Sequence, residues 1–147
     1  MRSKKGFTLI EFTIAAAIVA VLASIGLGGY QSHIQNTNFN LMREAASKFA
    51  LKQQQHRQTF GQYASKVQTQ GKASATTLIF PQASDFKTTI LSSDFRSFSA
   101  SLEPKSTSFA LKKNCQTLHV QSRQGYLSFT SIDANKQDSS NACLPRG

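Results

Sequence analysis

The sequence has few of the residues from which enzyme and metal sites are usually built. Its 147 residues include 7 Asp+Glu, 3 His and 2 Cys. The histidines, His33, His56 and His119, are scattered, which favours surface or packing roles. The carboxylates are not paired, and no nucleophile elbow, phosphate-binding loop or metal-ligand spacing occurs. The sequence therefore predicts a protein that is not an enzyme and has no catalytic residues, metal or other cofactor.

The two cysteines, Cys115 and Cys143, lie in the last third of the chain. They have no CxxC spacing and no adjacent histidines, so a zinc site is poorly supported. In a chain that crosses a membrane, they are better explained as one disulfide formed in an oxidising compartment. Closing a loop of this length stabilises a domain by roughly 3–4 kcal/mol in the chain-entropy model. We therefore expect a Cys115–Cys143 disulfide.

The shortage of acidic residues leaves the chain strongly basic, with 17 Lys+Arg and a formal net charge of +10. A basic surface attracts nucleic acid, anionic lipid headgroups or an acidic partner, and charge alone does not choose among them. Positive charges on loops at one end of a domain would form a phosphate-contacting patch. A solvated basic surface is the alternative explanation. The candidate DNA-binding residues are Lys112, Lys113, Asn114, Arg123, Lys136 and Arg146.

The aromatic residues of the C-terminal half are mostly expected in the core. The alternating strand patterns predict core positions for Phe95, Phe98, Phe109 and Phe129. Tyr126, next to Arg123 and Gly125 at an expected hairpin tip, is the one aromatic side chain kept as a candidate for stacking on a base.

Charge is also nearly absent from residues 7–29, where Glu11 is the only charged residue. An apolar run of about 20 residues is long enough to span a bilayer as a helix. The basic residues before it predict that the N-terminus stays cytoplasmic while the rest crosses. A cleaved secretory signal and a plain anchor are the alternatives, but a charge inside the run is unusual for both. A lone carboxylate there costs at least about a few kcal/mol, so Glu11 needs a partner.

The segment Gly6-Phe7-Thr8-Leu9-Ile10-Glu11 resembles the leader of type IV pilins. The resemblance implies that a prepilin peptidase cleaves between Gly6 and Phe7 and that the new N-terminal Phe7 is N-methylated. It also implies that Glu11 pairs with the N-terminal amine of a neighbouring subunit. A buried charge that only a correctly docked neighbour neutralises would specify the axial register of an assembly.

The same resemblance divides the chain into a leader peptide (1–6), a transmembrane and filament-core helix (7–29) and a globular pilin domain (30–147). The expected partners are other pilin subunits, the prepilin peptidase and the inner membrane before assembly, with DNA as a further candidate. The expected location is the inner membrane for the precursor, then an extracellular type IV pilus filament.

Hydrophobic periodicity predicts one long helix from about Phe7 to Gln58, apolar all round in its first half and amphipathic in its second. Gly61 is a plausible helix C-cap. Because one face of the second half must be covered, we expect it to pack on a sheet. The predicted apolar stripe consists of Ile34, Leu41, Ala45, Phe49 and Phe60.

Residues 66–94 are rich in small polar residues and predict a long loop with at most a short strand. After them, alternation predicts antiparallel strands through Phe98, Ala100 and Leu102, through Phe109 and Leu111, and in a hairpin from Leu118 and Val120 to Leu127 and Phe129. The expected fold is α+β. It is the type IV pilin fold, a long N-terminal helix on a three- to four-stranded antiparallel sheet with a C-terminal disulfide-closed loop.

Residues 53–64 resemble the helix end and following turn of the PilE-like branch of the family, which includes minor pilins. The leading functional hypothesis is a structural subunit of a type IV pilus, with a minor pilin preferred although major and minor pilins share the same leader. One alternative is a ComP-like, DNA-binding minor pilin that serves DNA uptake in natural transformation. Another is a pseudopilin of a type II secretion system.

Overall fold

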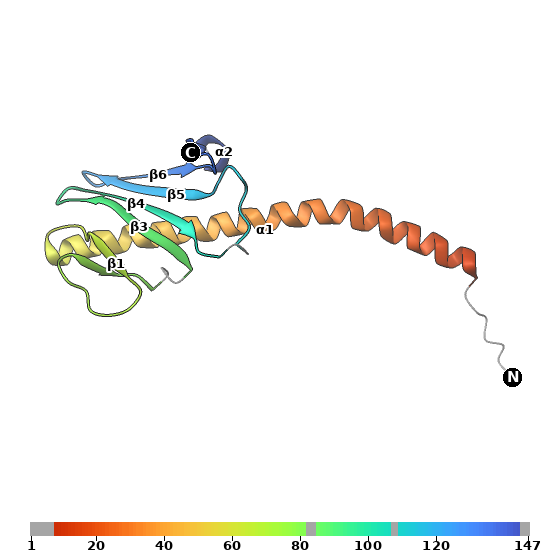
Figure 1. Ribbon diagram of the computed structural model, residues 1–147, viewed down its shortest axis with the longest axis horizontal. Helices are drawn as coiled ribbons and strands as arrows, with labels where there is room; N and C mark the ends of the chain where they lie inside the picture. Colours follow the sequence, from red (N-terminus) through yellow and green to blue (C-terminus); the bar gives the residue numbers. More distant parts are fainter. Residues whose placement is uncertain (1–7, 82–84, 107–108, 145–147) are drawn as a thin grey trace. The chain divides into compact units, whose positions relative to one another are not determined.

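The structure is a computed structural model, and it describes residues 8–81, 85–106 and 109–144. This part of the chain forms two compact units, divided after Ile34. The elements, in chain order, are α1 (Leu9–Phe60), β1 (Lys66–Gln68), β2 (Thr77–Ile79), β3 (Phe86–Ser93), β4 (Ser97–Pro104), β5 (Thr117–Arg123), β6 (Tyr126–Ile132) and α2 (Ser140–Cys143) (Figure 1).

The long helix α1 begins and ends within two residues of the predicted bounds. It ends because Gly61 adopts a left-handed backbone conformation with φ of 78°. The Gly61 N–H donates to the carbonyl of Arg57 at 2.8 Å, which satisfies one of the last free helix carbonyls. The predicted C-cap is therefore confirmed.

The buried face of α1 in the second unit differs in part from the predicted stripe. Ala45 and Phe49 are buried as expected, but Leu41 is 47% exposed and Phe60 39% exposed. The face that meets the sheet recurs at spacings of three and four residues. It is made of Phe39, Met42, Ala46, Phe49 and Gln53, with Ala45 and Ala50 beside them. The prediction followed the large apolar residues, whereas small alanines and one glutamine occupy the closest contacts.

Gln53 can occupy this buried face because the chain that follows α1 satisfies its amide group. Its Nε2 donates to the carbonyl of Ala64 at 3.1 Å, and its Oε1 accepts from the Ala64 N–H at 2.9 Å. Buried His56 ties down the same segment, with Nδ1 3.0 Å from the Gln62 carbonyl and Nε2 2.7 Å from the Ser74 carbonyl. These bonds hold residues 61–76 against the end of the helix.

The main sheet is antiparallel with strand order β3-β4-β5-β6, and β1 and β2 form a separate parallel pair. The prediction of a loop over residues 66–94 is wrong, since β3 is a full member of the sheet. On the core face of β3 the polar Thr88, whose hydroxyl is buried, separates the apolar Phe86 and Ile90. A bulge between Ile90 and Ser92 then interrupts the alternation. This weak pattern explains why a strand was not predicted there.

The predicted strand through Phe109 and Leu111 is also wrong. The described residues between β4 and β5 form a connection without strand structure. Both side chains pack against the core from this connection, and the ring of Phe109 meets that of Phe86 edge-on at 5.3 Å. The Asn38 side chain donates to the Ala110 carbonyl at 2.9 Å and fixes the connection to α1. The apolar residues Phe109 and Leu111 alternate with polar or small ones because both contact the core from a loop, not because they belong to a strand.

The remaining strand predictions are confirmed, and they place the core between α1 and the sheet. Phe98, Ala100 and Leu102 of β4 are buried, and β5 and β6 form the predicted hairpin. Aromatic rings meet edge-on across the core, with centroids 6.0 Å apart for Phe49 and Phe98. The core placement of Phe95 is wrong, since this side chain lies in the β3–β4 turn and is 68% exposed.

Candidate functional site

The first candidate site is the N-terminal part of α1. Every side chain from Leu9 to Ser24 is exposed, and the large apolar ones keep between 56% (Ile14) and 83% (Leu9) of their surface uncovered. By length and composition, this helix is able to cross a membrane. A helix that is apolar all round is stable only when lipid or other protein surrounds it. This segment therefore requires surroundings that its own unit does not supply.

The one charged side chain of this segment is built into the start of the helix. Thr8 is the N-cap, since its carbonyl accepts the first helical hydrogen bond from the Phe12 N–H at 3.2 Å. Oε2 of Glu11 accepts from the Thr8 N–H at 2.9 Å and from the Thr8 hydroxyl at 2.8 Å. The Glu11 N–H donates to Oγ1 of Thr8 at 3.3 Å. The two residues form a capping box, which fixes the direction of the carboxylate.

The capping box adds Thr8 to the functional residues, and the sequence analysis missed it. The spacing Thr-x-x-Glu ahead of an apolar run is a recognised start signal for a helix, so the pattern was present in the sequence. Both carboxylate bonds are made to Oε2, and among the described residues Oε1 has no hydrogen-bond partner. Gly6 and Phe7, the predicted cleavage and methylation residues, lie outside the described residues.

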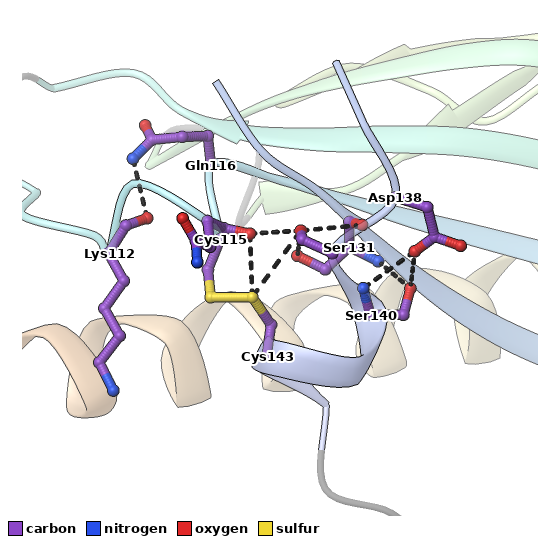
Figure 2. Close-up of a disulfide and its surroundings, with 9 residues drawn as sticks. Lys112, Cys115, Gln116, Ser131, Asp138, Ser140 and Cys143 are labelled. Atoms are coloured by element: carbon purple, nitrogen blue, oxygen red, sulfur yellow. Dashed lines mark hydrogen bonds between the residues drawn. A yellow bond between two sulfur atoms is a disulfide. The ribbon is translucent and has the colours of Figure 1, made fainter. Parts of the chain in front are cut away.

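The second candidate site is the closed loop at the C-terminus. Cys115 and Cys143 form a disulfide with their Cα atoms 5.8 Å apart, as predicted (Figure 2). The tail also bonds to β6, because the Ser139 N–H donates to the Ser131 carbonyl at 2.8 Å and the Ser131 N–H donates to the Ser140 hydroxyl at 2.9 Å. The disulfide and these bonds attach residues 139–143 to the sheet.

A comparison with protein families identifies the N-terminal segment. Residues 1–27 match the family model described as the prokaryotic N-terminal methylation motif. The chain carries a type IV pilin signal. This motif marks type IV pilins and pseudopilins, and it implies processing by a prepilin peptidase and assembly with other pilin subunits. No curated protein matches the chain.

The fold agrees with this type IV pilin signal. A long helix packed on a four-stranded antiparallel sheet, with a late disulfide, is the α+β fold expected for type IV pilins. The signal and the apolar helix also fit a precursor held in the inner membrane before assembly.

The predicted DNA-binding residues of the second unit that the structure describes fall on two separate surfaces. Lys112, Lys113 and Asn114 are exposed just before Cys115, and the Lys113 carbonyl accepts from the Ala134 N–H at 3.2 Å. This bond brings the exposed Lys136 turn beside them. These four residues make up the disulfide-end surface.

Arg123 lies at the far end of β5 from the disulfide-end surface. The seven residues of β5 span about 20 Å at roughly 3.3 Å per residue. This distance exceeds the Debye length of about 8 Å at physiological ionic strength, so the two surfaces act on a ligand separately. Arg146 lies outside the described residues.

Arg123 has a neighbour that the sequence analysis did not single out. Arg96 and Arg123, with Ser97 and Gln124, line a hollow of about 360 Å³. The Gln124 N–H donates to the Arg96 carbonyl at 3.2 Å, and Ser97 pairs with Arg123 across the two strands. Arg96 was missed because the alternating pattern from Phe95 onward predicted a strand there, whereas the structure has the β3–β4 turn.

Asp94 shapes the turn that presents Arg96. Its carboxylate accepts hydrogen bonds from the Arg96 N–H at 2.6 Å and from the Ser97 hydroxyl at 2.9 Å. The Arg96 N–H, followed by the hydroxyl and N–H of Ser97, holds the pKa of Asp94 below its ordinary value. The carboxylate therefore stays ionised and organises the backbone between β3 and β4.

Proposed function

We propose that this protein is a structural subunit of a type IV filament and that the N-terminal half of α1 is its assembly element. The observation that carries the proposal is the apolar surface exposed on all sides of α1 from Leu9 to Ser24, with a single carboxylate at its start. In the precursor, lipid would surround this surface. In a filament, the corresponding helices of neighbouring subunits would replace the lipid.

Glu11 supplies the specificity in this proposal. The Thr8 N–H and hydroxyl, together with the positive end of the helix dipole, compensate its charge while the subunit stands alone. Cleavage before Phe7 would create an amine close to this position. An amine from a neighbour could then bond to Oε1, which the capping box leaves available. A charge pair enclosed by apolar helices is stable only when the geometry is correct, so wrong registers would be rejected.

The proposal is tested by separating processing from assembly. In Glu11→Gln, the leader should still be removed, but the amount of subunit recovered in sheared filaments should fall at least about tenfold, the effect of about 1.4 kcal/mol. Thr8→Val should lower incorporation to a smaller extent, whereas Thr8→Ser, which keeps the hydroxyl, should assemble normally. Processed Glu11→Gln subunits at wild-type abundance in filaments would contradict the proposal.

Within this function we favour a minor subunit of a pilus over a major pilin or a type II secretion pseudopilin. The disulfide-closed C-terminal loop and the resemblance of residues 53–64 to the PilE-like branch favour a pilin over a pseudopilin, and that branch includes minor pilins. Quantitative mass spectrometry of purified pili tests it directly. The proposal predicts that this chain is present at a small fraction of the major subunit. Recovery only in secretion-system filaments would overturn it.

A second candidate function is DNA binding, as in DNA uptake during natural transformation. It is favoured by the exposed cationic groups at both ends of the sheet, since such groups are able to bind phosphates. Loss of DNA binding by the full chain after removal of these cations, with filament assembly intact, would support this function. Equal uptake of DNA by cells with and without the gene would contradict it.

A further inference from the structure

One end of the sheet combines cationic and aromatic side chains on adjacent turns. Figure 1 shows the β3–β4 turn and the β5–β6 turn at the same end of the sheet as the C-terminal end of α1. We call this region the hairpin-end surface and define it by Phe95, Arg96, Arg123 and Tyr126. The backbone bond from Gln124 to Arg96 holds the two turns together.

The two arginines of the hairpin-end surface share one hollow, which Ser97 and Gln124 complete. Both arginines are exposed, and within the described part of the chain no hydrogen bond or ion pair occupies the Arg123 guanidinium. A guanidinium group offers several N–H donors in a fixed plane and binds phosphate oxygens in pairs. Two of them around one hollow form a site for an anion with several oxygens.

The two aromatic rings offer uncovered faces beside these arginines. Tyr126 is 83% exposed and pairs directly with Arg123 across β5 and β6, so the two side chains lie on the same face of the sheet. Phe95, which is 68% exposed, directly precedes Arg96. Exposed rings next to arginines are the arrangement on which unpaired bases stack while their phosphates bind.

The charge of the hairpin-end surface remains positive in spite of Asp94. The carboxylate of Asp94 faces the N–H groups of its own turn and the hydroxyl of Ser97. A third arginine, Arg57, lines a second hollow with Tyr63 and with Gly125 of the β5–β6 turn. Its guanidinium is 5.4 Å from the centre of the Tyr63 ring.

The disulfide-end surface has cations but lacks the other features. Neither of the segments 110–116 and 133–144 contains an aromatic residue, and Asp133 and Asp138 lie among the lysines. Lysine is a flexible point charge that does not bind phosphate in a fixed plane. The disulfide end can therefore attract a polyanion without orienting it.

From these contacts we propose that the hairpin-end surface binds single-stranded nucleic acid. Arg96 and Arg123 hold successive phosphates, and a base stacks on Tyr126. A single strand is favoured over a duplex because duplex bases are already stacked and cannot reach an exposed ring. The inference deepens the second candidate function by naming a single strand as the ligand, and it rests on the proposed filament function because a filament subunit displays this domain outside the membrane.

The main test measures binding of the full chain, in zwitterionic micelles, to a labelled oligothymidylate. The double variant Arg96→Ala/Arg123→Ala should bind at least about tenfold more weakly, and the salt slope should fall by about 1.4 for two lost phosphate contacts. The matched control, Lys112→Ala/Lys113→Ala, removes the same charge at the disulfide end and should change binding less than about twofold. Equal losses in the two variants would overturn the proposal.

Tyr126 separates a nucleic-acid site from a general anion site. Tyr126→Leu keeps an apolar side chain but removes the ring, and it should weaken oligothymidylate binding about tenfold. The same change should leave binding of inorganic polyphosphate unaltered. No effect on oligothymidylate, tighter binding of a duplex of equal length, or tighter binding to anionic phospholipid vesicles would each contradict the proposal.

Filament assembly keeps this test independent of the proposed function. Both double variants retain Thr8 and Glu11, so they should enter filaments at wild-type levels. Normal assembly with unchanged binding by Arg96→Ala/Arg123→Ala would refute the binding site and leave the filament function intact. Normal assembly of Glu11→Gln would refute the filament mechanism whatever the binding results are.

Discussion

The two halves of α1 belong to one continuous helix but satisfy their apolar side chains in different ways. From Leu9 to Ser24 every side chain is exposed. From Phe39 to Gln53 one face is buried against the sheet, and the other faces solvent. The same secondary structure therefore has two uses. The second half completes a core within the chain, and the first half presents an apolar surface to partners outside it.

The two halves of α1 differ because different neighbours supply the contacts that stabilise their apolar side chains. Full burial of a large apolar side chain contributes about 1.5–3 kcal/mol, and Phe49 and Met42 obtain this contribution from β4 and their other neighbours. Ile14 and Ile18 obtain only a small part of it within their own unit, since each is 56% exposed. Lipid or other subunits must supply the missing contribution. Substitutions in the two halves should therefore be detected by different measurements.

The largest expected effect separates the two halves directly. Phe49→Ala leaves a cavity among Phe80, Phe98 and the helix, and it should lower the free energy of unfolding by about 3–5 kcal/mol. Ile14→Ala should not change it, because the side chain is exposed in its unit. Chemical denaturation of the full chain in micelles, followed by tyrosine fluorescence, measures both, because Tyr63 is buried whereas Tyr30 and Tyr126 are exposed before unfolding. A similar decrease in the free energy of unfolding in both variants would contradict the claim that only the second half of α1 stabilises the folded domain.

A smaller effect compares the two faces of the second half of α1. Gln53→Met keeps the length of the side chain but leaves the N–H and carbonyl of Ala64 without their partners, which costs about 1–3 kcal/mol. Gln55→Met, two residues away on the exposed face, should change stability by less than about 0.5 kcal/mol. The denaturation midpoints of the two variants measure the two changes in stability. Equal midpoints would show that Gln53 does not anchor the segment after the helix.

The smallest effect concerns Asp94 in the β3–β4 turn, whose side chain bonds to neither half of α1 among the described residues. Because hydrogen bonds from Arg96 and Ser97 lower the pKa of Asp94, the ionised carboxylate stabilises the folded turn. This contribution is complete above the ordinary Asp value of about 3.9 and is lost as pH falls through the lowered pKa. Acidification below about pH 4 should therefore destabilise the wild-type protein slightly more than Asp94→Asn. Identical acid profiles of thermal unfolding would exclude the effect.

The sequence predicted most reliably the features that depend on a uniform pattern. The apolar run before Tyr30 and the motif around Glu11 are local, so the membrane-type helix and the pilin signal could be recognised without a structure. The β5–β6 hairpin was also predicted, because Leu118 and Val120 alternate cleanly and Gly125 marks the turn.

The errors occurred where packing, rather than the local pattern, decides the structure. Strand β3 was missed because its bulge breaks the alternation, and Leu41 was taken as core although the sheet covers a neighbouring face of the helix. The hairpin-end surface could not be predicted for the same reason. Arg96 and Arg123 are far apart in the sequence, and only the pairing of Ser97 with Arg123 brings them to one hollow.

The central claim is that the N-terminal half of α1 is released from its leader and assembled into a filament. Mass spectrometry of the N-terminal peptide of this chain, recovered from purified filaments, tests this most directly. The account predicts a peptide that begins at Phe7 and carries one methyl group on its amine. A chain that keeps Met1 through Gly6, or that stays in the membrane fraction and never enters filaments, would contradict the account.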